Sequence, residues 1–105
     1  FGSHLDYEGL DHIHELSWQR QGHLFGVPFY YVEYGIAQLG ALQMWQYHRR
    51  DSSNALARYK AGLALGYTRG LTELFEASGL ALSFSEKHVS GIIAEIESAL
   101  DEIPA

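Results

Sequence analysis

One histidine and three tyrosines, close together in the first third of the sequence, have side chains suited to catalysis. His23 stands before a glycine-containing turn, and Tyr30, Tyr31 and Tyr34 follow it. Phenol hydroxyls and neutral imidazoles can donate hydrogen bonds to an oxygen that gains negative charge during a reaction. Residues three and four apart share one side of a helix, so the tyrosines can cluster there. Because aromatic residues at this spacing also build helix cores, the pattern leaves two interpretations open, an oxyanion-stabilising cluster and a packed aromatic stripe.

The elements that must position these residues are predicted to be helices. Apolar residues recur at helical spacing, and no segment shows the clean alternation of a half-buried strand. We predict a first helix over residues 7–24, capped by Asp6. A second helix is predicted over residues 28–49, because the fixed φ of Pro28 suits the first helical position. Its buried side is predicted to hold Phe29, Val32, Ile36, Leu39, Leu42 and Trp45.

Three further helices are predicted in the second half of the chain. One covers residues 53–66, after a cap signal at residues 51–54, and a short one ends near Ser78, with Thr68 as its cap and Gly79 as its stop. The last runs from a cap at Ser85 to about Asp101. The residues predicted to face inward are Ala55, Leu56, Tyr59, Leu63, Tyr67, Leu71, Leu74, Phe75, Val89, Ile92, Ile93, Ile96, Leu100 and Ile103. Glycines at 62, 66 and 70 could let another backbone approach closely. The prediction is an all-α bundle of about five helices around one apolar core, a single domain over residues 1–105.

Metal-binding signals in the chain are weak. The sequence His14-Glu15-Leu16-Ser17 is followed by Trp18, where a His-Glu-x-x-His zinc helix needs its second histidine. His12 and His14 are two apart, so they leave a helix in nearly opposite directions. We therefore expect no metal site in this chain. His88, Lys60 and the charges of the last helix are interpreted as solvated surface.

Composition excludes several classes of function. The 105 residues are 47% apolar and 19% charged, which is typical of a folded rather than a disordered chain. The net charge of −6 argues against nucleic acid and anionic membranes as partners. The sequence contains no cysteine, no apolar run long enough for a membrane span and no secretory signal. A cytoplasmic location is expected, and a chain that begins with Phe1 is expected to be a piece of a longer protein.

Residues 15–21 (ELSWQRQ), His23 and residues 28–45 (PFYYVEYGIAQLGALQMW) together form a long and specific pattern. The pattern resembles the C-terminal part of the catalytic domain of M3-family zinc metallopeptidases, the oligoendopeptidase F type. The remainder, to about Ile103, has a weaker likeness to the helical tail of that family. The resemblance implies that the chain is a C-terminal segment of a larger helical domain that cleaves short peptides internally. It also implies that the zinc ligands and the water-polarising glutamate lie upstream, so that this chain alone is inactive.

The same resemblance assigns roles to individual residues. His23 matches the family histidine before the aromatic helix, and Tyr34 best matches the tyrosine that bonds the oxyanion. Tyr30 is the second candidate for that bond, or a contact to the substrate backbone, because the loop over residues 24–27 varies in length between branches of the family. Tyr31 and Phe29 are assigned to substrate binding, although a packed aromatic with its hydroxyl at the surface is the preferred interpretation of Tyr31.

The expected partners are a peptide substrate, the upstream part of the catalytic domain and, for the isolated chain, further copies of itself. The alternative function is a non-catalytic helical module whose tyrosine face docks a protein partner. A stand-alone histidine metal binder is a third class, which the histidine spacing disfavours. A His-Glu-x-x-His helix encoded upstream of Phe1 would support the peptidase.

Overall fold

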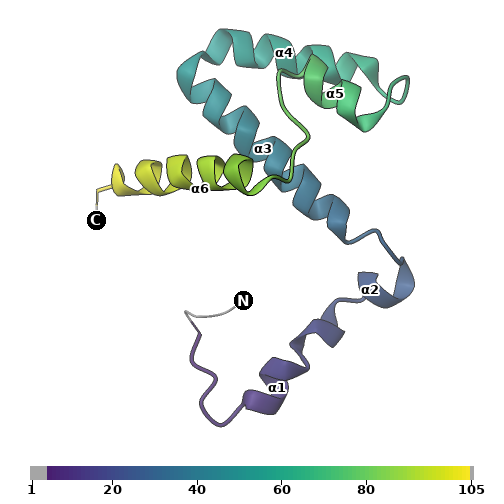
Figure 1. Ribbon diagram of the computed structural model, residues 1–105, viewed down its shortest axis with the longest axis vertical. Helices are drawn as coiled ribbons and strands as arrows, with labels where there is room; N and C mark the ends of the chain where they lie inside the picture. Colours follow the sequence, from purple (N-terminus) through teal and green to yellow (C-terminus); the bar gives the residue numbers. More distant parts are fainter. Residues whose placement is uncertain (1–4, 105) are drawn as a thin grey trace. The chain divides into compact units, whose positions relative to one another are not determined.

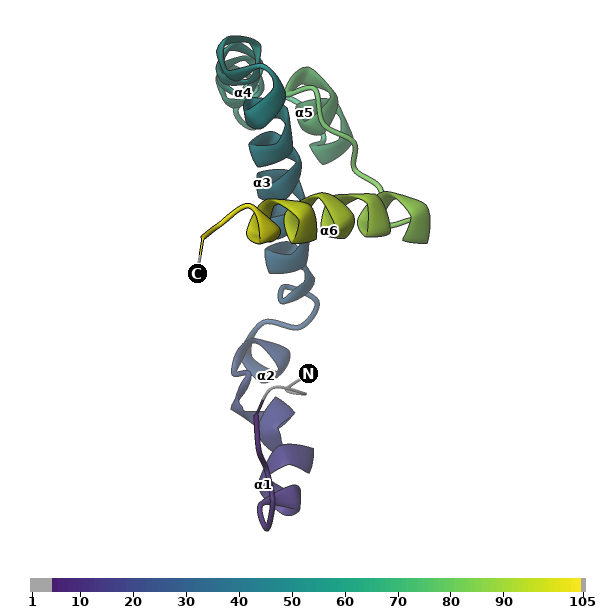
Figure 2. The same cartoon turned by 90° about the vertical axis from the view of Figure 1, so that its left-hand side faces the viewer.

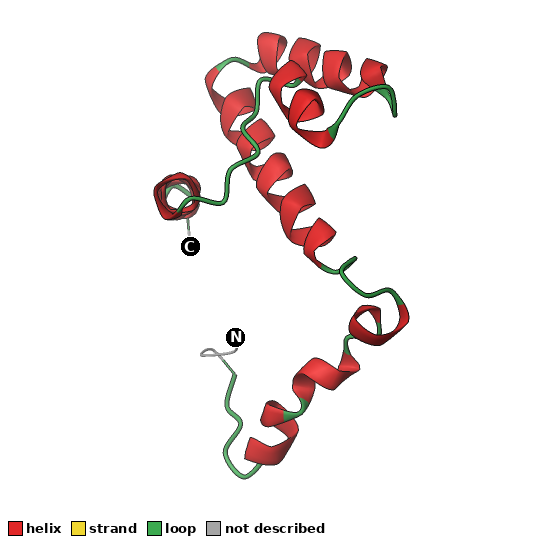
Figure 3. Cartoon of the chain, turned by 45° about the vertical axis from the view of Figure 1, so that its right-hand side comes forward, coloured by secondary structure: helices red, strands yellow, loops and turns green. Residues whose placement is uncertain are grey.

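A computed structural model describes residues 5–104, and within that range it contains helices and loops but no strand (Figure 3). The predicted all-α class is confirmed. The described residues form six α-helices and one short 3-10 helix, compared with about five predicted helices. The chain divides into two units, one up to Glu33 and one from Tyr34 onward, and each is considered by itself.

The first unit consists of short helical pieces. They are α1 (Asp11–Glu15), the 3-10 helix η1 (Ser17–Arg20) and α2 (His23–Gly26) (Figure 1). The single helix predicted over residues 7–24 is therefore wrong. Asp6 does not cap a helix, because its carboxylate accepts the backbone N–H of Glu8 at 2.9 Å in a local turn. None of the described residues of this unit is buried, so they form no buried core that would stabilise a longer helix.

Pro28 opens a turn and not a helix. The backbone N–H of Tyr30 donates to the carbonyl of Val27 at 3.1 Å, and Phe29 has a φ of 67°. A proline at the second position and a positive φ at the third are features of a type II turn. The following helix, α3, consequently begins later than predicted, at Val32–Arg50. Tyr30 and Tyr31 lie before α3, so the prediction that three tyrosines share one side of a helix is wrong.

The second unit contains most of α3 together with three further helices. These are α4 (Ser52–Leu65), α5 (Leu71–Ala77) and α6 (Glu86–Asp101). Helices α4 and α5 lie side by side, and α6 crosses α3 (Figures 1 and 2). The predicted bounds of α4 and α6 are confirmed to within one residue. No helix among residues 5–104 has both the length and the apolar character needed to cross a bilayer.

Local capping explains why α4 and α6 begin where predicted. The carboxylate of Asp51 accepts the backbone N–H of Asn54 at 3.1 Å, and the hydroxyl of Ser85 accepts that of His88 at 3.3 Å. Each bond satisfies one of the unpaired N–H groups of a first helical turn. Both predicted caps are confirmed.

The start of α5 was predicted incorrectly, and its end correctly. Gly70 and not Thr68 stands at its N-cap, where the backbone N–H of Gly70 donates to the carboxylate of Glu73 at 3.1 Å. Thr68 instead donates its hydroxyl to the Leu65 carbonyl at the end of α4. At the other end Gly79 has a φ of 75°, and its successor donates to the Phe75 carbonyl at 2.8 Å. This Schellman arrangement uses the freedom of glycine in the left-handed region.

The core of the second unit is small and partly polar. Ala55 and Ile92 are its buried apolar residues, and the amides of Gln43 and Gln46 are buried beside them. Gln43 forms a two-way clasp with Ala81, donating to its carbonyl at 3.0 Å and accepting its N–H at 2.9 Å. Gln46 donates to the Ile92 carbonyl of α6 at 3.4 Å. Side-chain amides of α3 therefore bond to the chain at two points, Ala81 before the start of α6 and Ile92 within α6.

Much of the surface predicted to be inward-facing is exposed instead. Ile36, Leu39, Leu42, Leu74, Phe75, Val89 and Ile96 are half-buried. Exposed residues among those predicted to face inward are Phe29, Val32, Trp45, Leu56, Tyr59, Leu63, Tyr67, Leu71, Ile93, Leu100 and Ile103. On α4 and α6, the neighbouring elements cover only part of the apolar side of each helix.

Of the three glycines predicted to let another backbone approach closely, Gly62 is the one that does so. A Cβ added to Gly62 would stand 1.9 Å from the Ser78 hydroxyl oxygen and 3.3 Å from the Leu74 carbonyl oxygen of α5. Gly66 and Gly70 are not used in this way, because a Cβ at either position would meet no atom closer than 3.5 Å.

The packing at Gly62 yields a test of the α4–α5 contact. Gly62→Ala is expected to lower the free energy of unfolding by about 1–3 kcal/mol, because the added methyl group overpacks the contact. Gly91→Ala is the matched control: its Cβ enters open space in the middle of α6 and should raise stability by up to about 1 kcal/mol. Urea unfolding followed by circular dichroism measures both. Equal effects of the two substitutions would show that α4 and α5 do not pack at Gly62.

The turn at Phe29 yields a second test. A bulky residue in the left-handed region costs about 1–2 kcal/mol, while glycine there loses about 0.4–1 kcal/mol through the entropy of the unfolded chain. Phe29→Gly should therefore slow hydrogen exchange at the Tyr30 amide, which bonds to Val27. Phe25→Gly, at a helical position in α2, should accelerate exchange in that segment. Faster exchange at Tyr30 in the Phe29→Gly variant would contradict the turn.

Candidate functional site

His23 and two of the predicted tyrosines meet in the first unit. The centre of the His23 ring lies 6.0 Å from that of Tyr30 and 5.8 Å from that of Tyr31, with 18° between the ring planes in each case. The imidazole is half-buried, whereas Tyr30 and Tyr31 are 42% and 41% exposed. We call these three residues the aromatic cluster. Its two tyrosines were predicted to lie on one side of a helix, but the structure places them after a turn, beside His23.

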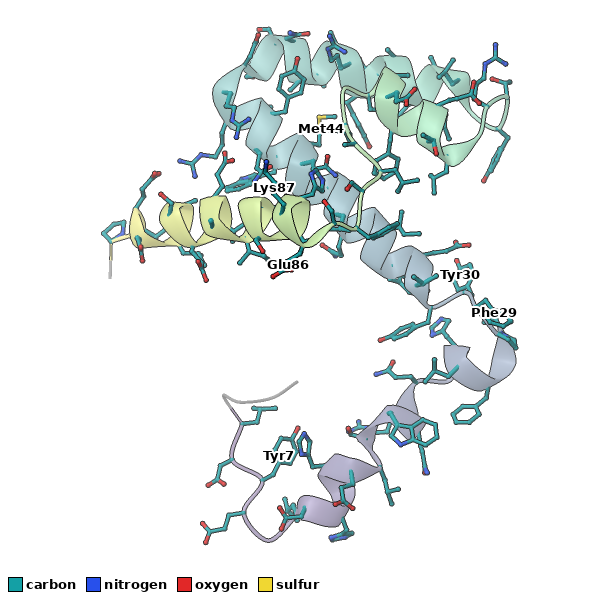
Figure 4. The ribbon with its side chains drawn as sticks, viewed as in Figure 1. Tyr7, Phe29, Tyr30, Met44, Glu86 and Lys87 are labelled. Atoms are coloured by element: carbon teal, nitrogen blue, oxygen red, sulfur yellow. The ribbon has the colours of Figure 1, made fainter. Side chains whose placement is uncertain are left out.

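Local backbone geometry explains how the aromatic cluster forms. His23 is the first residue of α2, and its carbonyl accepts the N–H of Val27 at 3.1 Å, at the end of that helix. The turn at residues 27–30 then changes the direction of the chain, and Tyr30 and Tyr31 follow it beside the imidazole. Figure 4 labels Phe29 and Tyr30 at this turn. An imidazole and two phenols gathered at an accessible surface can donate hydrogen bonds to an anionic oxygen.

The other predicted site residues lie around this cluster in the sequence. Tyr34 occupies the first turn of α3, where it is 47% exposed. Phe29 is 97% exposed at the turn (Figure 4). The role of Tyr34 at an oxyanion, and those of Phe29 and Tyr31 in substrate binding, stay predictions.

The described residues do not make a zinc site. No group of three His, Cys, Asp or Glu side chains is gathered within residues 5–104. The His14 ring, from the incomplete zinc motif, stacks on Tyr7 with ring centres 4.2 Å apart. Three protein ligands are the usual minimum for catalytic zinc, so the donors present in this range do not fit the metal that the resemblance implies.

Sequence reasoning did not find an apolar groove between α3, α4 and α5. Its volume is about 660 Å³, within the range of small-molecule pockets. Among the residues that line it are Gly40, Met44, Tyr59, Gly62, Leu63 and Phe75, and Met44 is labelled on α3 in Figure 4. The one available signal was the spacing of the glycines, which indicates that backbones approach but not that a hollow forms beside them.

No family model matches this chain, and no curated protein or solved structure shows significant similarity to it. The resemblance to M3 peptidases therefore depends on the residues of the sequence itself.

Proposed function

We propose that this chain is the C-terminal segment of the catalytic domain of a zinc-dependent oligoendopeptidase, a cytoplasmic enzyme that hydrolyses short peptides. One observation carries the proposal. His23 lies against Tyr30 and Tyr31, directly before the helix that bears Tyr34, and all four residues belong to the run that resembles the M3 family. The resemblance supplies the reaction, and the cluster supplies donors of the right chemical type.

The proposed role of these residues is to stabilise a transition state. Attack on a peptide carbonyl produces a tetrahedral intermediate whose oxygen carries negative charge, and positioned N–H and O–H donors lower its energy. Tyr34 is the proposed donor to this oxygen, with Tyr30 as the second candidate and His23 as a further donor. Phe29 and Tyr31 are proposed to contact the substrate. Because residues 5–104 do not gather three metal ligands, the proposal places the zinc site in the upstream part of the catalytic domain.

The surface of the first unit is consistent with such an upstream partner. None of its described residues is buried, although many are large and apolar, including Ile13, Leu16, Trp18, Leu24 and Phe25. Apolar surface of this extent marks sites that pack against other protein. In the proposal, the rest of the catalytic domain covers it.

A second candidate function is a helical protein-interaction module without catalysis. The apolar groove of about 660 Å³ favours it, because an amphipathic helix or an apolar ligand binds in grooves of this kind. In this alternative the hydroxyls of Tyr30 and Tyr34 have no part in a reaction, which the following experiment distinguishes.

Tyr34→Phe in the intact enzyme is expected to lower kcat by about 10²–10³, the effect of losing one oxyanion donor. The ring and its packing are kept, so KM and zinc content should change little. Tyr31→Phe is the matched control and should be nearly silent. Steady-state hydrolysis of a quenched peptide measures both. Loss of activity in Tyr30→Phe but not in Tyr34→Phe would exchange the two roles, and full activity in both variants would contradict the catalytic proposal.

The 105-residue chain by itself is expected to self-associate and to leave the quenched peptide uncleaved when zinc is added. Its exposed apolar residues in the first unit favour association at about tens of micromolar. Sedimentation velocity measures the oligomeric state, and Phe25→Ser, which removes one large exposed side chain, should reduce association. A monomer at these concentrations, or turnover that Tyr34→Phe abolishes, would count against the proposal.

A further inference from the structure

A polar pocket lies between α3, α4 and α6, on the second unit. Its volume is about 490 Å³, and its lining includes Arg50, Arg58 and His88 together with the amides of Gln43 and Gln46. Among the described residues, no aspartate or glutamate lines it. In a chain with a net charge of −6, a lining with cationic groups and no carboxylate favours an anionic ligand over a cationic one.

The two arginines of the pocket differ in their partners. Arg50 forms an ion pair with Glu95 of α6, so part of its charge is neutralised. Arg58 has no ion pair or side-chain hydrogen bond among the described residues, and its Cδ would lie 2.7 Å from a Cβ built on Gly79. The stem of Arg58 is therefore held against the backbone at the end of α5, while its guanidinium keeps its planar set of donors for a ligand.

His88 adds an unsatisfied buried nitrogen. Its Nε2 is buried and has no hydrogen-bond partner within the described part of the chain. A buried polar atom without a partner is costly, so a rotation of the half-buried imidazole that brings a ring nitrogen to a ligand oxygen would remove that cost. The interpretation of His88 as solvated surface is therefore wrong.

A neighbouring hollow continues along α6 and is lined by further charged residues. It shares Gln46, Arg50 and His88 with the first pocket and adds Lys87 and the paired Glu95. Figure 4 shows Lys87 and Glu86 on opposite sides of the first turn of α6. Lys87 lines this neighbouring hollow and not the first pocket.

We propose that this polar pocket binds an oxyanion, the carboxylate or phosphate group of a small ligand. Arg58 forms the charge-assisted contact, the imidazole of His88 turns to supply a second donor, and Arg50, which is paired with Glu95, adds a further cationic group. Planar guanidinium groups recognise both kinds of oxyanion. The proposal is independent of the proposed peptidase function, because none of these residues belongs to the aromatic cluster.

Titration of the 105-residue chain with inorganic phosphate and with acetate tests the proposal. Nuclear magnetic resonance of the His88 imidazole and the Arg58 guanidinium follows binding, with a Kd of about 1 mM or below expected for the preferred anion. Tighter binding of phosphate than of acetate identifies a phosphate-bearing ligand, and tighter binding of acetate identifies a carboxylate. No saturable change at either group with either anion would overturn the proposal.

Two variants and one control localise the site. Arg58→Met keeps the stem against Gly79 and removes the charge, so affinity should fall at least about tenfold. His88→Phe keeps a ring and removes the donor, and should weaken binding severalfold. Arg69→Met removes the same charge from an exposed arginine that pairs with Glu73 outside the pocket, and should leave the Kd unchanged. Equal losses in Arg58→Met and Arg69→Met, with circular dichroism showing both variants folded, would contradict the site.

Discussion

The second unit depends on one buried amide. Gln43 of α3 donates to the carbonyl of Ala81 and accepts its N–H, across 38 residues of sequence. This bond pair fixes the segment between α5 and α6, which forms no regular secondary structure that could satisfy its own backbone groups. Loss of the clasp would leave the buried amide of Gln43 without its long-range partners, and an unpaired buried polar group costs about 1–3 kcal/mol. In a unit whose buried apolar residues are Ala55 and Ile92, that cost is a large share of the stability available.

The clasp also explains why a polar pocket exists in a small helical unit. Because Ala81 is held on α3, α6 begins close to the buried amides and crosses α3 at Ile92, whose carbonyl accepts from Gln46. Arg50, Arg58 and His88 line a hollow beside these amides, and Gln43 and Gln46 are part of its lining. The ion pairs from Arg49 and Arg50 to α6 are exposed at one partner or both and contribute little on their own. The position of α6 is therefore set by the amides and by Ile92.

Whether a feature could be predicted from the sequence depends on how far apart along the chain the interacting residues lie. The caps at Asp51 and Ser85 and the glycine stop at Gly79 depend on neighbours within a few residues, and all three were predicted. Pro28 fits both the first turn of a helix and the second position of a turn, and the positive φ of Phe29 decides between them. The Gln43 clasp joins residues too far apart for any local pattern to reveal. For the same reason the polar pocket was missed, since its lining comes from three helices and the loop after α5.

The two candidate sites therefore differ in what forms them: local backbone geometry forms the aromatic cluster, and packing between helices forms the polar pocket. The aromatic cluster is built from residues within nine positions of one another, and its geometry follows from the α2 terminus and the turn at Phe29. The polar pocket exists only while α6 is held across α3, so its lining side chains separate when the clasp and the Ile92 contact are lost. A local cluster in a unit whose residues 5–33 include none that is buried gains rigidity when another surface covers it. If the aromatic cluster is the set of transition-state donors proposed above, its preorganisation depends on a covering surface, whereas the lining of the polar pocket comes from the second unit alone.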